Sequence, residues 1–573
     1  NYKDTFKDKH NLDVMVGSEY FGYNEFMMEA KTQNSPTDDI PTLNAGASRT
    51  STKSEKTGYR IASVFGRVNY NYQMKYLLSL VARYDGISRL KDNRWGFFPG
   101  VSVGWNVTEE DFWKESKISE VISNIKPRLS YGVNGNVNGI GNFDIYGIYK
   151  QIGAGNYDGA TAYYNSSLIN TGLRWEQSRS FEAGLDLGFF NNRLSFIFDY
   201  YNRTTDDLLT DVNLPAYTGF SSMKTNLGKL RNSGFEMEVR ANILSNAKGF
   251  NWEVSANLTS VSNKVLKLPT SDKPFNQIDG YEVAAGLYNP ETGETPTKWI
   301  GGYREGGKLG DMVGYVQNHI FRDWNDVKAN ANMVIDEVAN LYGPGMANEI
   351  NPQTGVTYAE SNGWKPIEPG DVCWEDINKD GKINSLDRAV VGNIFPKVTG
   401  GFSTTLSYKN WSLYARFDYA LGHTIYNDLK ARSLGQYQGQ FNIIDKVHDT
   451  WSETNPDTDL PVFTYADQLN KKNITRSNNG NTAVDNNSSR FYEKGDYLAL
   501  REITLSYSLP KKWIGKAGMQ DASVYVTGQN LFYITGYDGV SPEPAVSTVY
   551  GRGIDNGRYP TPRTLLFGLS VTF

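Results

Sequence analysis

Residues 181–189 read Phe-Glu-Ala-Gly-Leu-Asp-Leu-Gly-Phe, and this alternation decides the fold. Apolar residues occupy every odd position, whereas Glu182 and Asp186 share the even positions with two glycines. Because successive side chains of a β-strand point to opposite faces, the segment has one apolar and one polar face. The same pattern recurs along the chain, at 194–201, 235–243, 252–259, 412–419 and 565–573. We therefore predict an all-β chain.

The lengths of the connections between these strands separate a soluble sheet from a membrane barrel. Going back from the end of the chain, long connections at 536–562, 425–495, 266–395, 206–225 and 137–172 alternate with short ones at 510–520, 409–410, 244–250 and 190–193. Upstream lie a connection at 107–124, with a small helix expected from Glu109 to Ile118, a shorter one at 89–93, and a tight turn at Gln73 and Met74. Outer-membrane barrels combine short periplasmic turns with long outer loops. We predict a transmembrane antiparallel β-barrel.

Composition agrees with a barrel and excludes other classes. No segment approaches the run of about 18 apolar residues that a membrane helix needs, and mean hydropathy is -0.51. A barrel strand exposes only every second residue to lipid, so its average stays polar. Aromatic residues reach 13%, as interfacial girdles require. The net charge of -5 argues against nucleic-acid binding, and a single cysteine, Cys373, excludes a disulfide framework.

The strand count indicates part of a larger barrel. These rules give about 15 strands, whereas plugged outer-membrane transporters have about 22. The chain starts in mid-strand at Asn1 and ends on Phe573, which resembles the assembly signal of outer-membrane proteins. We expect residues 1–573 to be the C-terminal part of a 22-stranded barrel, with the plug domain and the first strands absent from this chain.

Several motifs carry a family resemblance. They are Phe65-Gly-Arg-Val-Asn-Tyr70, Lys75–Leu78, Arg83-Tyr-Asp-Gly86, Arg94-Trp-Gly-Phe-Phe-Pro-Gly100, Gly104–Asn106, Glu109–Phe112, Asp376–Gly381 with Pro396 and Gly400–Gly401, Gly495–Leu498, Leu500–Arg501, Ile503, Tyr507–Pro510, Gly528–Leu531 and Tyr559–Phe573. Together they resemble the SusC-like (SusC/RagA) branch of TonB-dependent outer-membrane transporters of Bacteroidetes. The resemblance covers nearly the whole chain.

This resemblance implies a function without chemistry on the substrate. Its members import a bulky nutrient, either an oligosaccharide (glycan) or a peptide, across the outer membrane, where the barrel contacts lipid and lipopolysaccharide. A SusD-like surface lipoprotein covers the outer loops. TonB acts through the N-terminal part, so no energy-coupling residue can be named here. We expect no enzyme activity and no nucleic-acid partner.

One motif has the spacing of a calcium loop. Hard Ca²⁺ prefers about six to eight oxygen ligands, arranged in such loops at fixed positions around a glycine. Here Gly381 permits the sharp turn, and Asp387 replaces the usual bidentate Glu. The expected ligands are Asp376, Asn378, Asp380, the Lys382 carbonyl, Asn384 and Asp387. The alternative is an Asx-rich turn held by its own hydrogen bonds. A bound ion would brace the loop rather than catalyse.

The polar strand faces should line the barrel interior. The charged residues expected there are Glu182, Asp186, Glu236, Glu238, Arg240, Glu253, Arg416 and Asp418. Substrate-binding residues cannot be chosen from the pattern. No catalytic residue is assigned, because His10, His319, His423 and His448 are scattered and adjacent carboxylates of one strand point opposite ways.

Two other function classes stay open at this point. The chain could be a surface adhesin or glycan-binding all-β module without transport, or a secreted carbohydrate-active enzyme. Dependence on detergent separates the barrel from both alternatives, and turnover of a polysaccharide would identify the enzyme.

Overall fold

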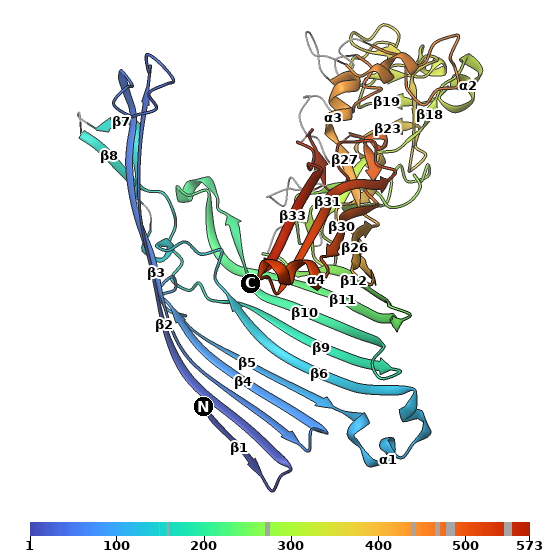
Figure 1. Cartoon of the computed structure of the whole chain (residues 1–573). Coiled ribbons are helices and arrows are strands. Elements are labelled where there is room, and N and C mark those ends of the chain that lie inside the picture. Colours follow the sequence, from blue (N-terminus) through green and yellow to red (C-terminus); the bar gives the residue numbers. More distant parts are fainter. Residues whose placement is uncertain are drawn as a thin grey trace. The chain divides into compact units, whose positions relative to one another are not determined.

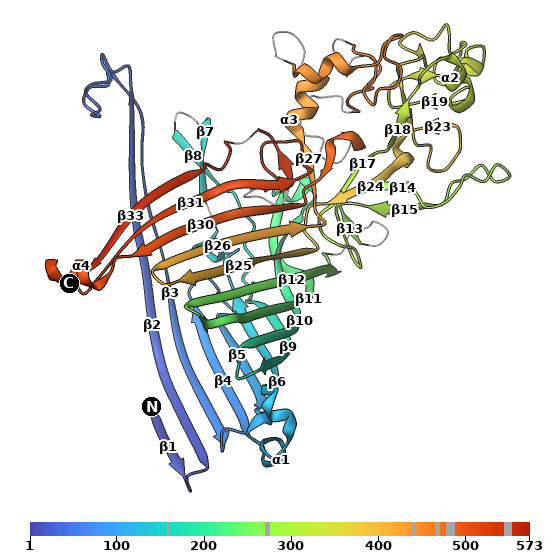
Figure 2. The same ribbon diagram turned by 45° about the vertical axis from the view of Figure 1, so that its right-hand side comes forward.

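The computed structural model describes residues 1–147, 149–157, 160–269, 276–436, 443–464, 470–476, 487–543, 553–557 and 559–573. Fifteen strands form one antiparallel sheet in chain order (Figures 1 and 2). They are β1 (Tyr2–Phe6), β2 (His10–Gln33), β3 (Ser48–Tyr72), β4 (Tyr76–Ile87), β5 (Trp95–Trp105), β6 (Ile122–Asn136), β9 (Glu176–Phe189), β10 (Leu194–Asn213), β11 (Ser222–Ala247), β12 (Phe250–Lys267), β25 (Val398–Tyr408), β26 (Trp411–Leu421), β30 (Tyr497–Ser508), β31 (Asp521–Thr535) and β33 (Thr564–Thr572).

The predicted alternation of short and long connections is confirmed in unit 2 but is less regular in unit 1. The predicted long connection 206–225 is mostly strand, because β10 continues to Asn213 and β11 begins at Ser222. Residues 190–193 join β9 to β10 and residues 409–410 join β25 to β26, as the pattern indicated. The expected helix after β5 is present as α1 (Asp111–Lys114), flanked by single 3₁₀ turns. Parts of the predicted long connections, at 270–275, 437–442, 465–469, 477–486, 544–552 and 558, lie outside the described residues.

The long connections carry small elements of their own. Between β6 and β9 these are β7 (Tyr149–Tyr157) and β8 (Ala160–Asn165). Between β12 and β25 they are β13 (Gln277–Ile278), β14 (Tyr281–Ala284), β15 (Thr297–Ile300), β16 (Tyr303–Arg304), β17 (Asp311–Tyr315), β18 (Gln317–Ile320), α2 (Trp324–Asn330), β19 (Ile335–Asp336), β20 (Leu341–Tyr342), β21 (Lys365–Pro366), β22 (Val372–Trp374), β23 (Lys382–Ile383) and β24 (Arg388–Asn393). Later come β27 (Thr424–Asn427), α3 (Asp428–Ala431), β28 (Asn487–Ser488), β29 (Tyr492–Lys494), α4 (Lys511–Ile514) and β32 (Ile554–Asp555).

The chain divides into two compact units. Unit 1 comprises Asn1–Gly234 and Lys264–Thr270, and unit 2 comprises Phe235–Asn263 and Ser271–Phe573. In unit 1 the largest apolar cluster includes Leu90, Ile140 and Leu173 from the long connections, packed against strand residues such as Phe98. In unit 2 the apolar clusters lie mainly within the long connections. The long connections therefore build folded structure rather than loose loops.

The strand register separates the two faces as the sequence predicted. In unit 1 the pairing places Tyr72 opposite Tyr76 and Tyr76 opposite Trp105, so three aromatic rings form one row next to the short connections. Tyr76 stacks on both neighbours, with ring centroids 6.4 and 6.5 Å apart. Aromatic rings in such a row match the girdle of a membrane barrel. Among the described helices, none is both long and apolar enough to span a membrane.

Candidate functional site

The polar face of unit 1 is held by ion pairs within and between strands. Arg128 of β6 donates to Asp186 at 3.1 Å and to Asp199 at 2.6 Å. Arg83 of β4 likewise donates to Glu19 at 2.8 Å and to Asp85 at 2.7 Å. The predicted residue Asp186 therefore lies on a charged face shared by several strands.

Two pockets open on this polar face. The larger, about 410 Å³, is lined by Phe65, Arg67, Arg83 and Phe98 together with glycine backbone from β5 and β6. Within the described part of the chain, Arg67 makes no ion pair or hydrogen bond, and its side chain is exposed. A guanidinium without a partner is available to oxygen atoms of a ligand.

The smaller pocket, about 270 Å³, is lined by hydroxyl groups and two charged residues. Its serines are Ser79, Ser102, Ser130 and Ser180, one from each of four successive strands. Glu182, predicted for the interior, lies in this pocket with Arg203, whose Nε donates to Ser180 at 3.0 Å. The strand pattern placed Glu182 correctly on the polar face, but it did not indicate that the serines meet there.

In unit 2 the predicted interior residues also share a face. The register pairs Glu253 with Thr405 and Thr405 with Tyr414, and Arg416 and Asp418 alternate with Tyr414 on the same side of β26. Glu238 accepts a hydrogen bond from Arg240 at 2.6 Å, and Glu236 lies two residues before Glu238 on β11. That all of these side chains line a water-filled interior stays a prediction.

Asp418 binds an arginine that the sequence did not single out as a site residue. Arg501 donates to both carboxylate oxygens of Asp418, the second at 3.0 Å, and to the Tyr533 hydroxyl at 3.0 Å. The register shifts at this point of β30, which leaves Arg501 as an extra residue against β26, whereas two residues of β31, Asn530 and Leu531, lie opposite Arg501. Such a bulge redirects a side chain, and no alternating pattern could have indicated it.

The two longest connections of unit 2 are joined by a buried ion pair. The Arg476 guanidinium donates to both oxygens of Asp336, at 2.7 and 3.0 Å, and the two side chains are 0% and 3% exposed. The Arg476 guanidinium also lies 4.3 Å from the ring centre of Trp374. The aromatic ring and the carboxylate replace the water that this cation loses on burial.

A second buried carboxylate receives a lysine. Lys471 donates to Asp371 and to Glu368, both at 2.8 Å, and Asn473 donates to Asp371 at 2.7 Å. Burial raises the pKa of Asp371 despite these donors. This contact again joins residues about 100 positions apart in the sequence, 371 and 471.

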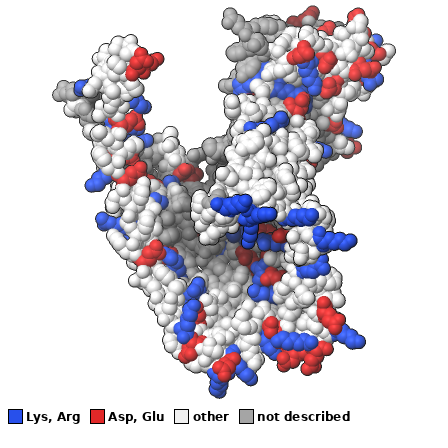
Figure 3. Space-filling view, viewed as in Figure 1, with Lys and Arg blue, Asp and Glu red and all other residues white. Residues whose placement is uncertain are grey.

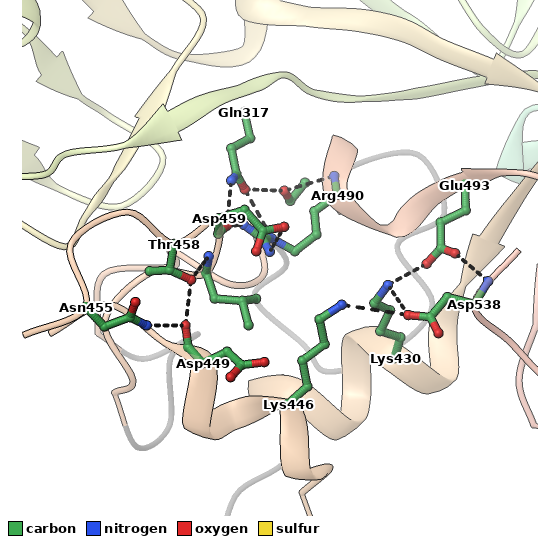
Figure 4. A network of polar contacts seen from close by, with 12 residues as sticks. Gln317, Lys430, Lys446, Asp449, Asn455, Thr458, Asp459, Arg490, Glu493 and Asp538 are labelled. Carbon is green, nitrogen blue, oxygen red and sulfur yellow. Dashed lines mark hydrogen bonds and ion pairs between the residues drawn. The ribbon is translucent and has the colours of Figure 1, made fainter. Parts of the chain in front are cut away.

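A polar network joins further segments of the long connections of unit 2, called the outer connections below (Figure 4). Lys430 donates to Glu493 at 2.9 Å and to Asp538 at 3.0 Å, and Lys446 lies 3.8 Å from Asp538. The Lys430 ammonium holds the pKa of Asp538 below its ordinary value. Nearby, Arg490 donates to Gln317 at 3.2 Å, and burial lowers the pKa of Arg490 to about 10.

The predicted calcium loop has the backbone of such a loop. Gly381 has φ +80° and donates its N–H to Asp376 at 2.9 Å, which closes the turn. Lys382 N–H donates to Asp380 at 2.8 Å. Asn384 begins a 3₁₀ turn, Ser385–Asp387, whose capping box pairs Asn384 with Asp387. Asn378 is buried at 1% exposure, beside this turn.

The carboxylates of the predicted calcium loop carry negative charge that no cation balances among the described residues. One oxygen of Asp376 is buried without a hydrogen-bond partner. Burial, together with the negative charges of Asp376 and Asp380, raises the pKa of Asp387 to about 6. Among the described residues, however, no group of three or more His, Cys, Asp or Glu side chains is arranged to hold a metal ion. The Asp387 oxygens instead accept from the N–H groups of Ile377 and Asn384, at 2.9 and 2.8 Å.

The four histidines contact different partners. His10 contacts Tyr70 at 2.8 Å, His319 contacts Asp326 at 3.1 Å, and His423 contacts the Pro542 carbonyl at 3.2 Å. His448 lies 3.7 Å from Asp445 in another segment. Each is explained by its local partner.

The family of the chain follows from similarity to known proteins. A family model described as TonB dependent receptor-like, beta-barrel matches residues 1–327, more than half of the chain. The chain belongs to the TonB-dependent receptor β-barrel family. It is 30% identical to TonB-dependent receptor P3 of Formosa agariphila over 98% of its length, and 29% identical to TonB-dependent receptor SusC of Bacteroides thetaiotaomicron, also over 98%. It spans about half the length of these relatives, 51% and 48%.

Solved structures agree on the fold. The structure titled "Structure of the RagAB peptide transporter" superposes with a TM-score of 0.73 at 23% identity, covering 100% of this chain and 54% of that one. The SusC-like resemblance and the all-β barrel fold are thus confirmed. This family consists of outer-membrane receptors and is not a class of enzymes, so the TonB-dependent barrel described here is an outer-membrane protein.

Proposed function

We propose that the chain forms the barrel wall and the outer loops of an importer that moves a bulky nutrient across the outer membrane. The observation that carries this proposal is the two-faced sheet, whose polar face has pockets lined by Arg67, Glu182 and serine hydroxyls. A surface adhesin has no need of hydrogen-bonding pockets on the face opposite its apolar side. The substrate would pass unchanged, by binding and release.

The substrate class that fits these pockets is an oligosaccharide or a peptide. Serine hydroxyls and a carboxylate hydrogen-bond well to sugar hydroxyls and to peptide groups, and a free guanidinium donates to a carboxylate. RagAB is described as a peptide transporter, which favours a peptide among relatives of this fold. A SusD-like lipoprotein over the outer loops and TonB on the periplasmic side are the partners that the SusC likeness supports.

Uptake by cells tests this proposal. A strain without the gene should lose uptake of the nutrient, which mass spectrometry of ligand purified with the full-length protein would identify as sugar or peptide. Arg67→Ala together with Glu182→Ala should reduce uptake at low substrate concentration by about thirtyfold, since each removes a polar contact of about 1 kcal/mol. Arg193→Ala, in the short connection 190–193, is the matched control.

Four results would contradict the proposal. Normal uptake in the deletion strain would exclude transport, and binding at the cell surface without uptake would favour the adhesin. A purified protein that stays monodisperse without detergent would exclude the membrane barrel. Turnover of a polysaccharide would favour an enzyme.

We also propose that residues 376–387 bind Ca²⁺, through Asp376, Asn378, Asp380, the Lys382 carbonyl, Asn384 and Asp387. The unpartnered Asp376 oxygen and the raised pKa of Asp387 both indicate negative charge that lacks a cation. Because the carboxylates do not surround one position, binding requires Asp387 to give up part of its backbone hydrogen bonds. The ion would order the outer connection 268–397.

Calorimetry with the full-length protein tests the calcium loop. Calcium should bind with a 1:1 stoichiometry and protect the connection from protease, and Asp376→Asn should abolish both effects. Asp457→Asn, an exposed carboxylate of another connection, should change neither. If calorimetry detects no heat of calcium binding to the unmodified protein, the segment is an Asx-rich turn and not a calcium loop.

A further inference from the structure

A row of aromatic rings crosses four neighbouring strands of unit 2 beside their short connections. The register pairs Phe250 with Tyr408, Tyr408 with Trp411, and Trp411 with Tyr507, one residue each from β12, β25, β26 and β30. Phe250 stacks on Tyr408 at 4.1 Å and Trp411 contacts Tyr507 at 4.7 Å between ring centroids. Aromatic rings of this kind lie at the level of lipid headgroups.

Lysines gather directly beyond this row, where Asp521 at the start of β31 is their acidic neighbour. The short connections 248–249, 409–410 and 509–520 contain five lysines and no acidic residue. We call these lysines the basic rim: Lys248, Lys409, Lys511, Lys512 and Lys516. All five are exposed, and within the described residues none forms an ion pair with a carboxylate. Blue side chains gather over α4 in Figure 3.

Trp513 extends the aromatic row into the basic rim. It lies on α4 between Lys512 and Lys516, and its side chain is 63% exposed although Ile514 beside it is buried. An indole beside lysines is the combination that anchors a protein surface at a membrane interface, because the ring enters the headgroup layer and the ammonium groups reach phosphate.

The connection 106–121 of unit 1 shows that this charge is not a property of every connection on this side of the sheet. The connection 106–121 contains five acidic residues and two lysines, and Lys75 of the neighbouring turn is paired with Glu110 at 3.0 Å. The basic rim therefore differs in charge from the connection 106–121 of unit 1.

We propose that the basic rim and Trp513 bind the phosphate groups of anionic phospholipids in the leaflet that faces the short connections. Short connections lie on the periplasmic side of outer-membrane barrels, and the aromatic row sets their depth at the headgroups. The surface is continuous with the lipid-facing side of the sheet, and its charge complements phosphate. The inference goes beyond nutrient import and depends only on placement in the outer membrane.

Native mass spectrometry of the full-length protein in mild detergent tests the proposal. The delipidated protein is titrated with phosphatidylglycerol or phosphatidylcholine, and bound lipid is counted. The unmodified protein should retain phosphatidylglycerol in preference to phosphatidylcholine. The variant Lys511→Ser/Lys512→Ser/Lys516→Ser should need on the order of a hundredfold more phosphatidylglycerol for the same occupancy, at about 1 kcal/mol for each lysine. The control Lys298→Ser/Lys308→Ser/Lys328→Ser removes the same charge from exposed lysines of the long connection 268–397 and should bind as the unmodified protein does.

Two further experiments distinguish lipid phosphate from free phosphate and test the surface with a variant that keeps all the lysines. Millimolar inorganic phosphate should not displace the lipid, whereas full displacement would indicate a simple anion site. Phosphatidylglycerol brominated near its headgroup should quench more fluorescence in the unmodified protein than in Trp513→Phe, a variant that keeps all five lysines. Equal retention of both lipids, equal loss in both triple variants, or no Trp513 contribution to quenching would overturn the proposal.

Discussion

The strands and the outer connections of unit 2 are stabilised by different kinds of interaction. In the β25–β26 hairpin each residue meets a partner fixed by register, such as Leu406 opposite Leu413, and the apolar face needs no protein cover because lipid supplies it. The outer connections have little regular structure and must enclose their own cores. There Arg476 pairs with Asp336 across 140 residues of sequence.

This difference separates local from non-local information. The face of the sheet on which a strand residue lies depends only on whether its position is odd or even. Substitution of one strand residue therefore leaves its neighbours in place. An outer connection depends on single buried charges that hold distant segments together. The loss of structure caused by a substitution should therefore extend through the outer connections but remain local in the strands. Substitutions in the connections and in the strands can test this expectation.

The largest effect should follow loss of the buried arginine. Arg476→Met leaves Asp336 buried without a cation, and a broken buried pair costs about 3–5 kcal/mol. We expect the outer connections to become sensitive to protease while the barrel keeps its heat-modifiable mobility on gels. Limited proteolysis followed by mass spectrometry measures the first effect, and electrophoresis with and without heating measures the second.

A double variant separates lost charge pairing from lost packing. Arg476→Met/Asp336→Leu replaces both ions by apolar groups, and such replacements are often neutral. It should recover most of the protease resistance that Arg476→Met loses. If the double variant is as sensitive as the single one, the cation–aromatic contacts with Trp374 matter more than the ion pair.

A smaller, local effect is expected for a charge on the apolar strand face. Phe417 stacks on Phe402 of the neighbouring strand, with ring centroids 4.6 Å apart. Phe417→Arg should lower the free energy of unfolding by about 2–4 kcal/mol, because lipid does not solvate the guanidinium. Thr405→Arg introduces the same group on the opposite face, directly across from Glu253, and should cost less than half as much. Urea unfolding of protein folded into lipid vesicles measures both. Equal costs would show that the two faces are not distinguished by lipid.

The sequence predicted the features that depend on local pattern. The strand faces, the turns at 190–193 and 409–410, and the sheet of fifteen strands all follow from alternation and connection length. Glu182 and Asp186 could be placed on the polar face because each strand carries this information within a few residues.

The rest could not be predicted, because it depends on contacts between distant segments. No pattern marks Arg476 or Asp336, and the pairing of Lys471 with Asp371 exists only after the connections fold. Arg501 was visible as part of a family motif, but its role beside Asp418 depends on a bulge in β30. The predicted calcium loop lies between these two cases. Its residue spacing predicts the ligands, but among the described residues the carboxylates do not surround one metal position.

The calcium loop should couple the outer connection to pH. The folded pKa of Asp387 is about 6, above the ordinary value of 3.8. The metal-free loop therefore binds a proton more tightly when folded, and its stability should rise as pH falls from 7 towards 4. Calcium competes with that proton, so stabilisation by calcium should disappear as pH falls through about 6. Protease resistance measured across this range, with calcium and with chelator, should show opposite slopes; parallel slopes would exclude Asp387 as a ligand.

The smallest effect is expected where a connection carries charge at its surface. Asp538 and Glu493 both accept from Lys430, but the Asp538 side chain is 62% exposed and that of Glu493 only 15%. Asp538→Asn should cost about 0–1 kcal/mol, the range for exposed ion pairs, because water replaces most of the lost attraction. Since Lys430 lowers the pKa of Asp538, this contribution exists above the ordinary pKa and is lost on acidification. Glu493→Gln should cost more, because Glu493 also accepts from the Asp538 N–H at 3.1 Å and is screened from water. Protease resistance of the two variants at neutral pH gives the order, and the reverse order would mean that burial does not govern how the outer connections are held together.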